Sequence, residues 1–98
     1  MNPPRYRIKH GALDALCEAL RSTTRENALQ CLRHTMDAME RLSQNGAKLV
    51  NMHELHEAMG FGTNRNNDLL ATLMRAGYVR WQEDPLGKQG YLFTPPPA

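Results

Sequence analysis

The sequence predicts a small, mainly α-helical domain that ends in a β-hairpin, which is an α+β fold. Apolar residues recur at helical spacing in four stretches of the chain. Near the C-terminus, two β-prone segments flank a loop rich in turn-forming residues. The chain has 98 residues and 41% hydrophobic content, which is enough apolar material for one modest core. We therefore expect a single domain.

A first, short helix is predicted over residues 12–21, because its apolar side chains fall on one helical face. These side chains are Leu13, Leu16, Cys17 and Leu20. Residues 1–10 before it are expected to form a basic N-terminal arm, and residues 95–98, with the sequence PPPA, a disordered tail. Residues 11–94 are thus the expected domain.

A second, longer helix of about twenty residues should begin near Thr23, because Thr23 and Glu26 have the spacing of a capping box. Its apolar stripe is Leu29, Leu32, Met36, Met39 and Leu42. Asn45 and Gly46 provide the left-handed backbone conformation at which helices commonly end. Residues 48–50 are then too few for a helix and are expected to be extended.

A third helix should begin at Asn51, which caps it in an arrangement with Glu54, and end at Gly60. Its buried face is expected to hold Met52, Leu55 and Met59. Only residues 61–63 precede the next helix, so the two helices should be joined by a tight turn.

The fourth helix begins near Asn64 and ends at Gly77. Its predicted buried stripe is Leu69, Leu70, Leu73 and Met74. The opposite face should present Asn64, Asp68, Thr72 and Arg75, with Asn67 at its border. Asn66 is expected to point inward. Residues 78–82 and 91–94 are predicted to form the hairpin, in which Trp81 packs across the strands as a structural residue.

These elements resemble the winged helix-turn-helix superfamily over residues 26–94. The likeness lies in the segments LVNMHELHEAMGFG, TNRNNDLLATLMRAGYV and YLFT, and LLATLMRAGYV is loosely similar to MarR-like bacterial regulators. The resemblance implies a winged helix-turn-helix with an additional N-terminal helix. It also implies that the fourth helix enters the major groove of double-stranded DNA, while the hairpin, or wing, lies along the backbone or minor groove.

On this reading, the start of the fourth helix supplies the DNA contacts, because asparagine can bond adenine and arginine can bond guanine in a bidentate way. The expected base contacts are Asn64, Arg65, Asn67 and Thr72. The expected phosphate contacts are Thr63, Arg75, Lys88, Arg5, Arg7 and Lys9. The alternative is that the asparagines only cap the helix or shape its turn. The N-terminal arm has its own alternative, in which Tyr6 and Ile8 pack on the domain and the charges face water.

The charge distribution leaves two functions open. The net charge is +2, but residues 1–50 carry eight Lys/Arg against five Asp/Glu, and residues 51–98 carry four against five. Glu83 and Asp84 also outnumber Lys88 at the expected wing tip, which is unfavourable for phosphate contact. One hypothesis is a sequence-specific, homodimeric transcriptional regulator. The alternative is a winged-helix protein–protein interaction module, an adaptor or an inhibitor of a larger complex, that does not bind DNA.

Other chemistry is not indicated. The segment HELHE places His53 and His56 three residues apart, whereas the zinc-protease pattern needs four. A solvated helix face is the simpler interpretation, although a metal site shared across a dimer stays open. We expect no enzymatic activity and no cofactor or metal. Cys17 and Cys31 are expected to be buried, free thiols. The absence of an apolar leader or span predicts a cytoplasmic location.

Overall fold

The computed structural model describes residue 14, residues 17–18, 24–44 and 46–94. The expected basic arm, the C-terminal tail and most of the expected first helix lie outside these residues. Asp14, Cys17 and Glu18 have helical conformation, in the stretch where that first helix is predicted.

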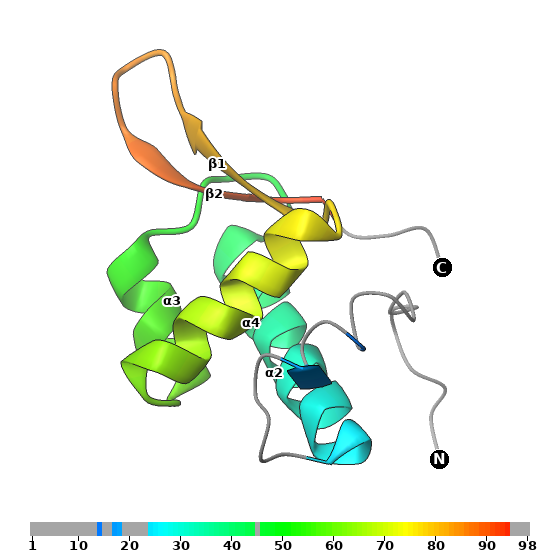
Figure 1. The fold of residues 1–98 in the computed structure, drawn as a ribbon. Coiled ribbons are helices and arrows are strands. Elements are labelled where there is room, and N and C mark those ends of the chain that lie inside the picture. The colour runs from blue at the N-terminus through cyan, green and yellow to red at the C-terminus, as the bar shows by residue number, and fades with distance from the viewer. Residues whose placement is uncertain (1–13, 15–16, 19–23, 45, 95–98) are drawn as a thin grey trace.

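The described part of the chain contains three full helices followed by an antiparallel hairpin (Figure 1). The prediction of a mainly helical α+β fold is confirmed. The elements are α2 (Arg25–Ser43), α3 (Met52–Met59), α4 (Thr63–Arg75), β1 (Val79–Glu83) and β2 (Gln89–Phe93).

The two ends of α2 are each displaced by one residue from their predicted positions. Thr24, rather than Thr23, is the N-cap, and its Oγ1 accepts a hydrogen bond from the backbone N–H of Asn27 at 3.1 Å. Gln44 takes the left-handed conformation that ends the helix, with φ of 52°. Gly46 is also left-handed, with φ of 90°. The stop was predicted one residue too late, because Gln44 itself adopts a conformation that favours glycine or asparagine.

The ends of α3 match their prediction. The Oδ1 of Asn51 accepts from the backbone N–H groups of His53 at 2.9 Å and Glu54 at 3.2 Å. Gly60 ends the helix in a left-handed conformation with φ of 72°. Met52, however, is 50% exposed, so the expectation that it shares the buried face is wrong. Met52 is the first residue of the helix, whereas the buried Leu55 and Met59 lie further along it.

The hairpin is joined to the helices through residue 50. In the hairpin, β1 pairs with β2 in a register that runs from Val79 opposite Phe93 to Glu83 opposite Gln89. Val50 adds a short antiparallel bridge to Tyr91, in which each backbone N–H donates to the other residue's carbonyl oxygen at 2.9 Å. The extended segment predicted just before α3 is therefore confirmed at Val50.

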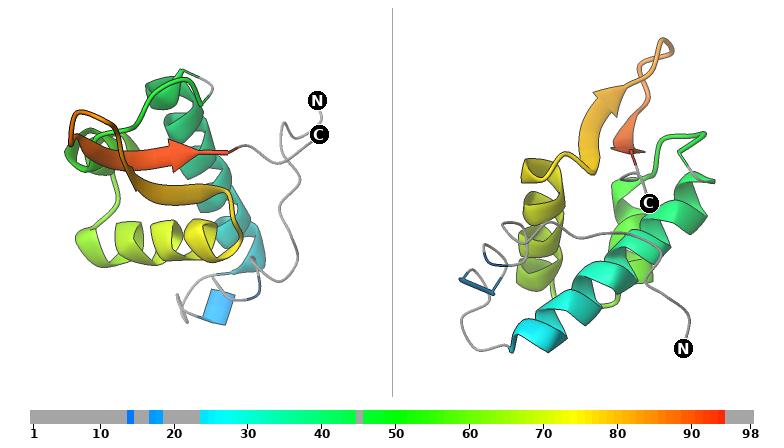
Figure 2. Two further views of the ribbon diagram at one scale, coloured as in Figure 1. Left: turned by 90° about the horizontal axis from the view of Figure 1, so that it is seen from above. Right: turned by 90° about the vertical axis from the view of Figure 1, so that its right-hand side faces the viewer.

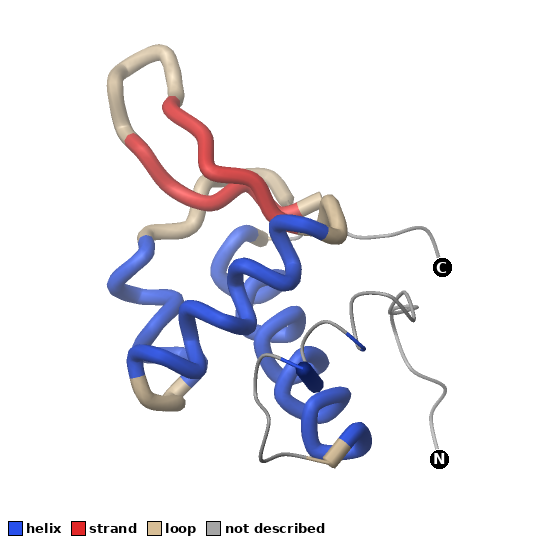
Figure 3. The backbone as a smooth tube through the Cα atoms, in the orientation of Figure 1, coloured by secondary structure: helices blue, strands red, loops and turns tan. Residues whose placement is uncertain are grey.

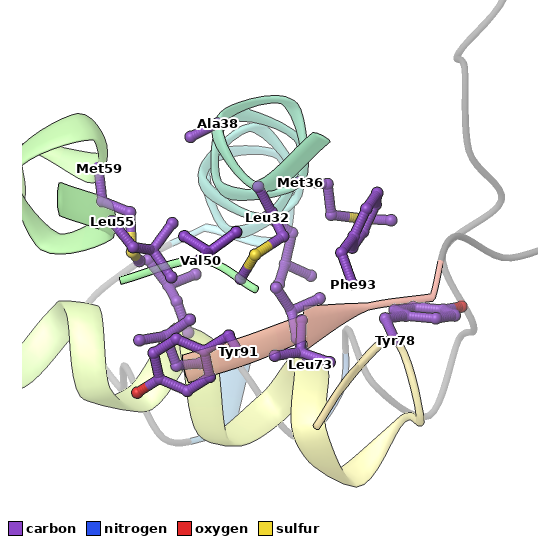
Figure 4. Close-up of a cluster of buried hydrophobic side chains, with 14 of the residues drawn as sticks. Leu32, Met36, Ala38, Val50, Leu55, Met59, Leu73, Tyr78, Tyr91 and Phe93 are labelled. Atoms are coloured by element: carbon purple, nitrogen blue, oxygen red, sulfur yellow. The ribbon is translucent and has the colours of Figure 1, made fainter. Parts of the chain in front are cut away.

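The core lies where α2 crosses behind α4 and beneath the hairpin. Figure 4 shows Leu32 and Met36 of α2 directed towards β2, where Phe93 and, from α4, Leu73 belong to the same buried cluster. The fully buried large side chains are Leu32, Met36, Met39, Val50, Leu55, Met59, Leu69, Leu73, Val79 and Phe93. Cys31 is buried, Cys17 is half-buried, and both are free thiols. In the described residues, no helix is long and apolar enough to cross a membrane.

The distal part of the hairpin projects away from the helices (Figure 3). In Figure 1 the hairpin tip and the start of α4 both lie towards the left, but the tip is at the top of the molecule and the start of α4 is near its bottom, as the right-hand view of Figure 2 also shows. The start of α2 lies towards the opposite side. The turn between α3 and α4 and the tip of the hairpin are thus well separated on the surface of the fold.

Candidate functional site

The start of α4 is held by its own apolar stripe. Leu69, Leu70 and Leu73 are buried, so the helix is fixed against the core along one face. Met74, which was predicted to complete this stripe, is 40% exposed, because it lies in the last turn, past the edge of the covered face. The fixed helix leaves Asn64 and Asn67 exposed in the first turns.

The N-terminal end of α4 is positively polarised. Gly62 is the N-cap and makes no side-chain cap hydrogen bond, and the first turn contains no acidic residue. The exposed residue Thr63 begins the helix. Backbone N–H groups at such an end carry a partial positive charge and can bind an anionic oxygen. The position of Thr63 is therefore compatible with the expected phosphate contact.

Arg65 is half-buried, whereas Asn64 and Asn67 are exposed. Its guanidinium carbon lies 6.0 Å from the centroid of the Phe61 ring. The Phe61 ring in turn contacts the His34 ring of α2, edge to face, at 5.6 Å. Sequence reasoning missed His34 and Phe61. Phe61 has a local signal, since it precedes Arg65 by four residues, whereas His34 is distant in the chain.

Asn66 points inward, as predicted, and is 3% exposed. Its Nδ2 lies 3.4 Å from Nδ1 and 3.5 Å from the carbonyl oxygen of His56 in α3. These long contacts join the two helices. One asparagine of the cluster is thus structural, whereas Asn64 and Asn67 remain available at the surface.

Thr72 is not on the exposed face of α4, so its predicted contact with a base is contradicted. It is 3% exposed, and its hydroxyl donates to the carbonyl oxygen of Asp68 one turn earlier, at 2.8 Å. A threonine inside a helix commonly makes this bond. Thr72 therefore does not belong to the candidate site.

Arg75 is exposed but lies in the last turn of α4. It is roughly 18 Å along the helix from Thr63, at 1.5 Å per residue. The structure therefore does not bring Arg75 together with the asparagines. The expected contacts Arg5, Arg7 and Lys9 lie outside the described residues.

The tip of the hairpin is organised by Asp84. Its Oδ1 accepts from the backbone N–H groups of Leu86 and Lys88, both at 2.9 Å. The Asp84 N–H donates to the Lys88 carbonyl oxygen at 2.8 Å, and the Gly87 N–H to the Asp84 carbonyl oxygen at 3.0 Å. The carboxylate of Asp84, which is unfavourable for phosphate contact, thus also shapes the turn. This turn holds Leu86 with 94% of its surface exposed.

Lys88 faces a hollow of about 430 Å³ between the hairpin tip and the start of α3. The residues that line the hollow are Ala47, Lys48, Leu49, Asn51, Glu54, Asp84 and Lys88. Two lysines and two carboxylates share this surface, so its formal charges cancel. Lys88 is exposed, as a phosphate contact requires, but Asp84 and Glu54 reduce the local positive potential.

Asp84→Asn is expected to leave the hairpin intact, because the amide Oδ1 can still accept both backbone N–H groups. Asp84→Ala should lower the free energy of unfolding by about 1 kcal/mol, since both bonds are lost. Hydrogen exchange of the Leu86 and Lys88 amides, measured by NMR, separates the two variants. Equal protection in Asp84→Ala and the wild type would show that the carboxylate does not hold the turn.

The HELHE segment is only partly the solvated helix face that was predicted. His53 and Glu57 are exposed, with Nε2 and Oε1 3.8 Å apart, but His56 is half-buried against Asn66. Within the described residues, no group of three metal-ligating side chains comes together. His34 lies between helices: its Nε2 is 3.1 Å from the carbonyl oxygen of Met59.

Among the residues that the structure describes, two ionisable groups have a clearly shifted pKa, and both lie outside the start of α4. A hydrogen bond to the Asp14 carboxylate raises the pKa of Arg25, at the exposed start of α2. Burial raises the pKa of the Tyr91 hydroxyl. The Tyr91 ring also contacts Trp81 edge to face, with centroids 5.0 Å apart, so the predicted packing of Trp81 across the hairpin is confirmed.

The candidate site is therefore the exposed first turns of α4, with Thr63, Asn64 and Asn67 and the half-buried Arg65 beside them, while the hairpin tip is a separate exposed feature. Comparison of the chain with protein-family models, with curated proteins and with solved structures finds no match.

Proposed function

We propose that this protein is a cytoplasmic, sequence-specific double-stranded DNA-binding protein of the winged helix-turn-helix type. In this proposal α3 and α4 are the two helices of the motif, and the β1–β2 hairpin is the wing. The observation that carries the proposal is the exposure of Asn64 and Asn67 at the leading end of a helix that the core holds firmly. Residues at this end of a recognition helix reach base edges in the major groove.

The chemistry of the first turns suits this role. Asn64 and Asn67 can each donate to N7 and accept from N6 of adenine, while Arg65 can donate to O6 and N7 of guanine. The uncapped N–H groups at Thr63 would face a phosphate oxygen. A single domain contacts few base pairs. We therefore infer that the protein regulates transcription as a homodimer that binds a palindromic DNA site, because two-fold symmetry doubles the number of contacts.

The second candidate function is protein–protein interaction through the hairpin tip. Leu86 is 94% exposed there, beside the acidic residues Glu83 and Asp84. An exposed apolar side chain on a well-formed turn suits a small apolar pocket in a protein partner, and the acidic neighbours suit a basic rim. This function needs the hairpin and not the asparagines.

Fluorescence anisotropy tests the proposal, with a random duplex and a duplex selected from a sequence pool, each titrated at several salt concentrations. Asn67→Ala should weaken binding to the selected duplex by roughly 5- to 150-fold, the equivalent of about 1–3 kcal/mol, because a bidentate base contact is lost. Binding to the random duplex should be unchanged. In both cases the logarithm of affinity should fall linearly with the logarithm of salt concentration.

Gln30→Ala is the matched control, since Gln30 is an exposed amide on α2, outside the candidate site. It should bind both duplexes like the wild type. Equal losses on both duplexes in Asn67→Ala would contradict base reading. A wild-type protein that binds neither duplex at low salt would favour the protein-interaction function, and Leu86→Ala would then be the variant to compare in pull-downs.

A further inference from the structure

Three side chains from three different elements form a continuous row behind the start of α4. They are His34 of α2, Phe61 of the α3–α4 turn and Arg65 of α4. The His34 and Phe61 rings are 5.6 Å apart and meet at 76°, and the Arg65 guanidinium carbon lies 6.0 Å from the Phe61 ring centroid. The row links α2 to Arg65, a residue of the candidate site at the start of α4.

His34 is anchored to the end of α3. Its Nε2 lies 3.2 Å from the carbonyl oxygen of Ala58 and 3.1 Å from that of Met59. Both partners are acceptors, so Nε2 carries a hydrogen and donates. Carbonyl groups in the last turn of a helix have no intrahelical N–H partner, and His34 supplies one. This bond fixes the orientation of the imidazole ring.

The anchored imidazole holds the Phe61 ring in turn. Phe61 is half-buried in the turn, and the edge-to-face geometry is the favourable arrangement for two aromatic rings. A ring restrained in this way offers a fixed surface to a cation. Arg65, four residues further along, places its guanidinium over that ring, where cation–π attraction operates.

A restrained arginine is useful for reading a base. The guanidinium is a planar fork whose N–H groups must align with two acceptors, and a freely rotating side chain loses conformational entropy when it aligns. Arg65 is half-buried whereas Asn64 and Asn67 are exposed, so it is the residue of this group whose direction the fold restricts.

We propose, on the basis of the function proposed above, that His34 and Phe61 are positioning residues that aim the Arg65 guanidinium at a guanine in the major groove. The bound DNA site would then contain a G·C base pair opposite the start of α4, recognised through N7 and O6 of the guanine. His34 and Phe61 act through Arg65 and do not touch the DNA.

Four variants separate positioning from simple support of the fold. Phe61→Leu keeps apolar bulk and removes the aromatic face, while Phe61→Tyr keeps the face. His34→Gln keeps an N–H donor for the α3 carbonyls and removes the ring. Arg65→Lys keeps the charge and removes the fork. Each variant is titrated by anisotropy against the selected duplex and against duplexes in which one base pair at a time is changed, and its thermal unfolding is recorded.

Arg65→Lys should reduce the preference for guanine at one base pair by roughly 5- to 150-fold, the range of a bidentate base contact. Phe61→Leu and His34→Gln should reduce the same preference by roughly 2- to 10-fold, as expected from loss of a cation–π or aromatic contact. Phe61→Tyr should retain it. The preferences at the other base pairs and the salt dependence of binding should not change. A loss of preference at one base pair alone would not result from a purely structural role of these residues, which would weaken binding to every duplex.

The outcomes distinguish the two proposals. The positioning role is overturned if the wild type prefers guanine and Phe61→Leu has the same preference. It is also overturned if Phe61→Leu binds every duplex more weakly by the same factor. In both cases the proposed DNA binding still stands. If the folded wild type binds no duplex, the proposed function fails, and the guanine role with it.

NMR of the free protein checks the row of His34, Phe61 and Arg65 directly. The resonances of the Arg65 side-chain protons should be shifted upfield by the aromatic ring in the wild type and Phe61→Tyr, and not in Phe61→Leu. An unshifted wild type also overturns the inference.

Discussion

Phe93→Ala is expected to lower the free energy of unfolding by about 3–5 kcal/mol, because a large aromatic side chain leaves a cavity that the core cannot fill. Phe93 is 2% exposed, pairs with Val79 at the base of the hairpin and lies close to Met36 of α2 (Figure 4). Its ring therefore joins the sheet to the central helix. A domain of this size has only about 5–15 kcal/mol of stability in total.

Urea unfolding, followed by circular dichroism and by fluorescence, measures the loss for Phe93→Ala. Trp81 is the only tryptophan in the chain and packs on Tyr91, so its fluorescence reports on the hairpin. Leu92→Ala is the control, since Leu92 is a half-buried neighbour on the other face of the strand and should cost roughly 1 kcal/mol. A loss below about 1 kcal/mol for Phe93→Ala would contradict its central place in the core.

Gly90→Ala is the second substitution with a large expected effect. A Cβ atom at this position would lie 2.7 Å from the Val50 carbonyl oxygen and 3.1 Å from the Leu49 Cβ. The first of these atoms belongs to the backbone, and its residue is hydrogen-bonded to Tyr91, so it cannot turn away as a side chain can. The strands must separate, and we expect a loss of about 1–3 kcal/mol from overpacking.

The readout for Gly90→Ala combines thermal unfolding with hydrogen exchange of the Val50 and Tyr91 amides, which should lose protection before the helices do. Gly62→Ala is the matched control, because a Cβ there meets nothing within 4 Å and its φ of −64° suits any residue. That variant should stay within about 1 kcal/mol of the wild type. Unchanged protection of both amides in Gly90→Ala would show that this contact is not tight.

The order and type of the elements could be predicted because the signals are local. Apolar residues three and four apart fix the buried faces of α2, α3 and α4, and the caps at Asn51 and Gly60 depend on neighbouring residues only. Where two equivalent residues stand side by side, the local signal is ambiguous. Thr23 and Thr24 are both threonines, and the structure uses Thr24.

The exposure of individual positions was predicted less well. Periodicity gives the angle of a residue around its helix, but it does not show where a neighbouring element ends. Met52 and Met74 lie at helix ends and are exposed, whereas Thr72 is covered near the point where β1 follows and packs on α4. Each of these errors concerns the boundary of a buried face.

The candidate site could be predicted only in part, for the same reason. Asn64, Arg65 and Asn67 follow from their place at a helix start. The restraint on Arg65 depends on the contact of Phe61 with His34, which belongs to another helix, and the shape of the hairpin tip depends on a carboxylate that the sequence presents only as a charge. Non-local contacts and side-chain hydrogen bonds within turns are not visible in a periodic pattern.

The bridge between Val50 and Tyr91 also has a consequence for how the chain acquires its structure during synthesis. The helices α2, α3 and α4 follow one another closely and can associate as soon as they emerge, but Val50 has no strand partner until Tyr91 has been made. At roughly 5–20 residues per second, that interval is about 2–8 s. During it, the nascent chain carries an open strand edge beside an uncovered apolar core, and such edges favour aggregation. The arrangement around Val50 can therefore be completed only after β2 has been made, however fast the helices form.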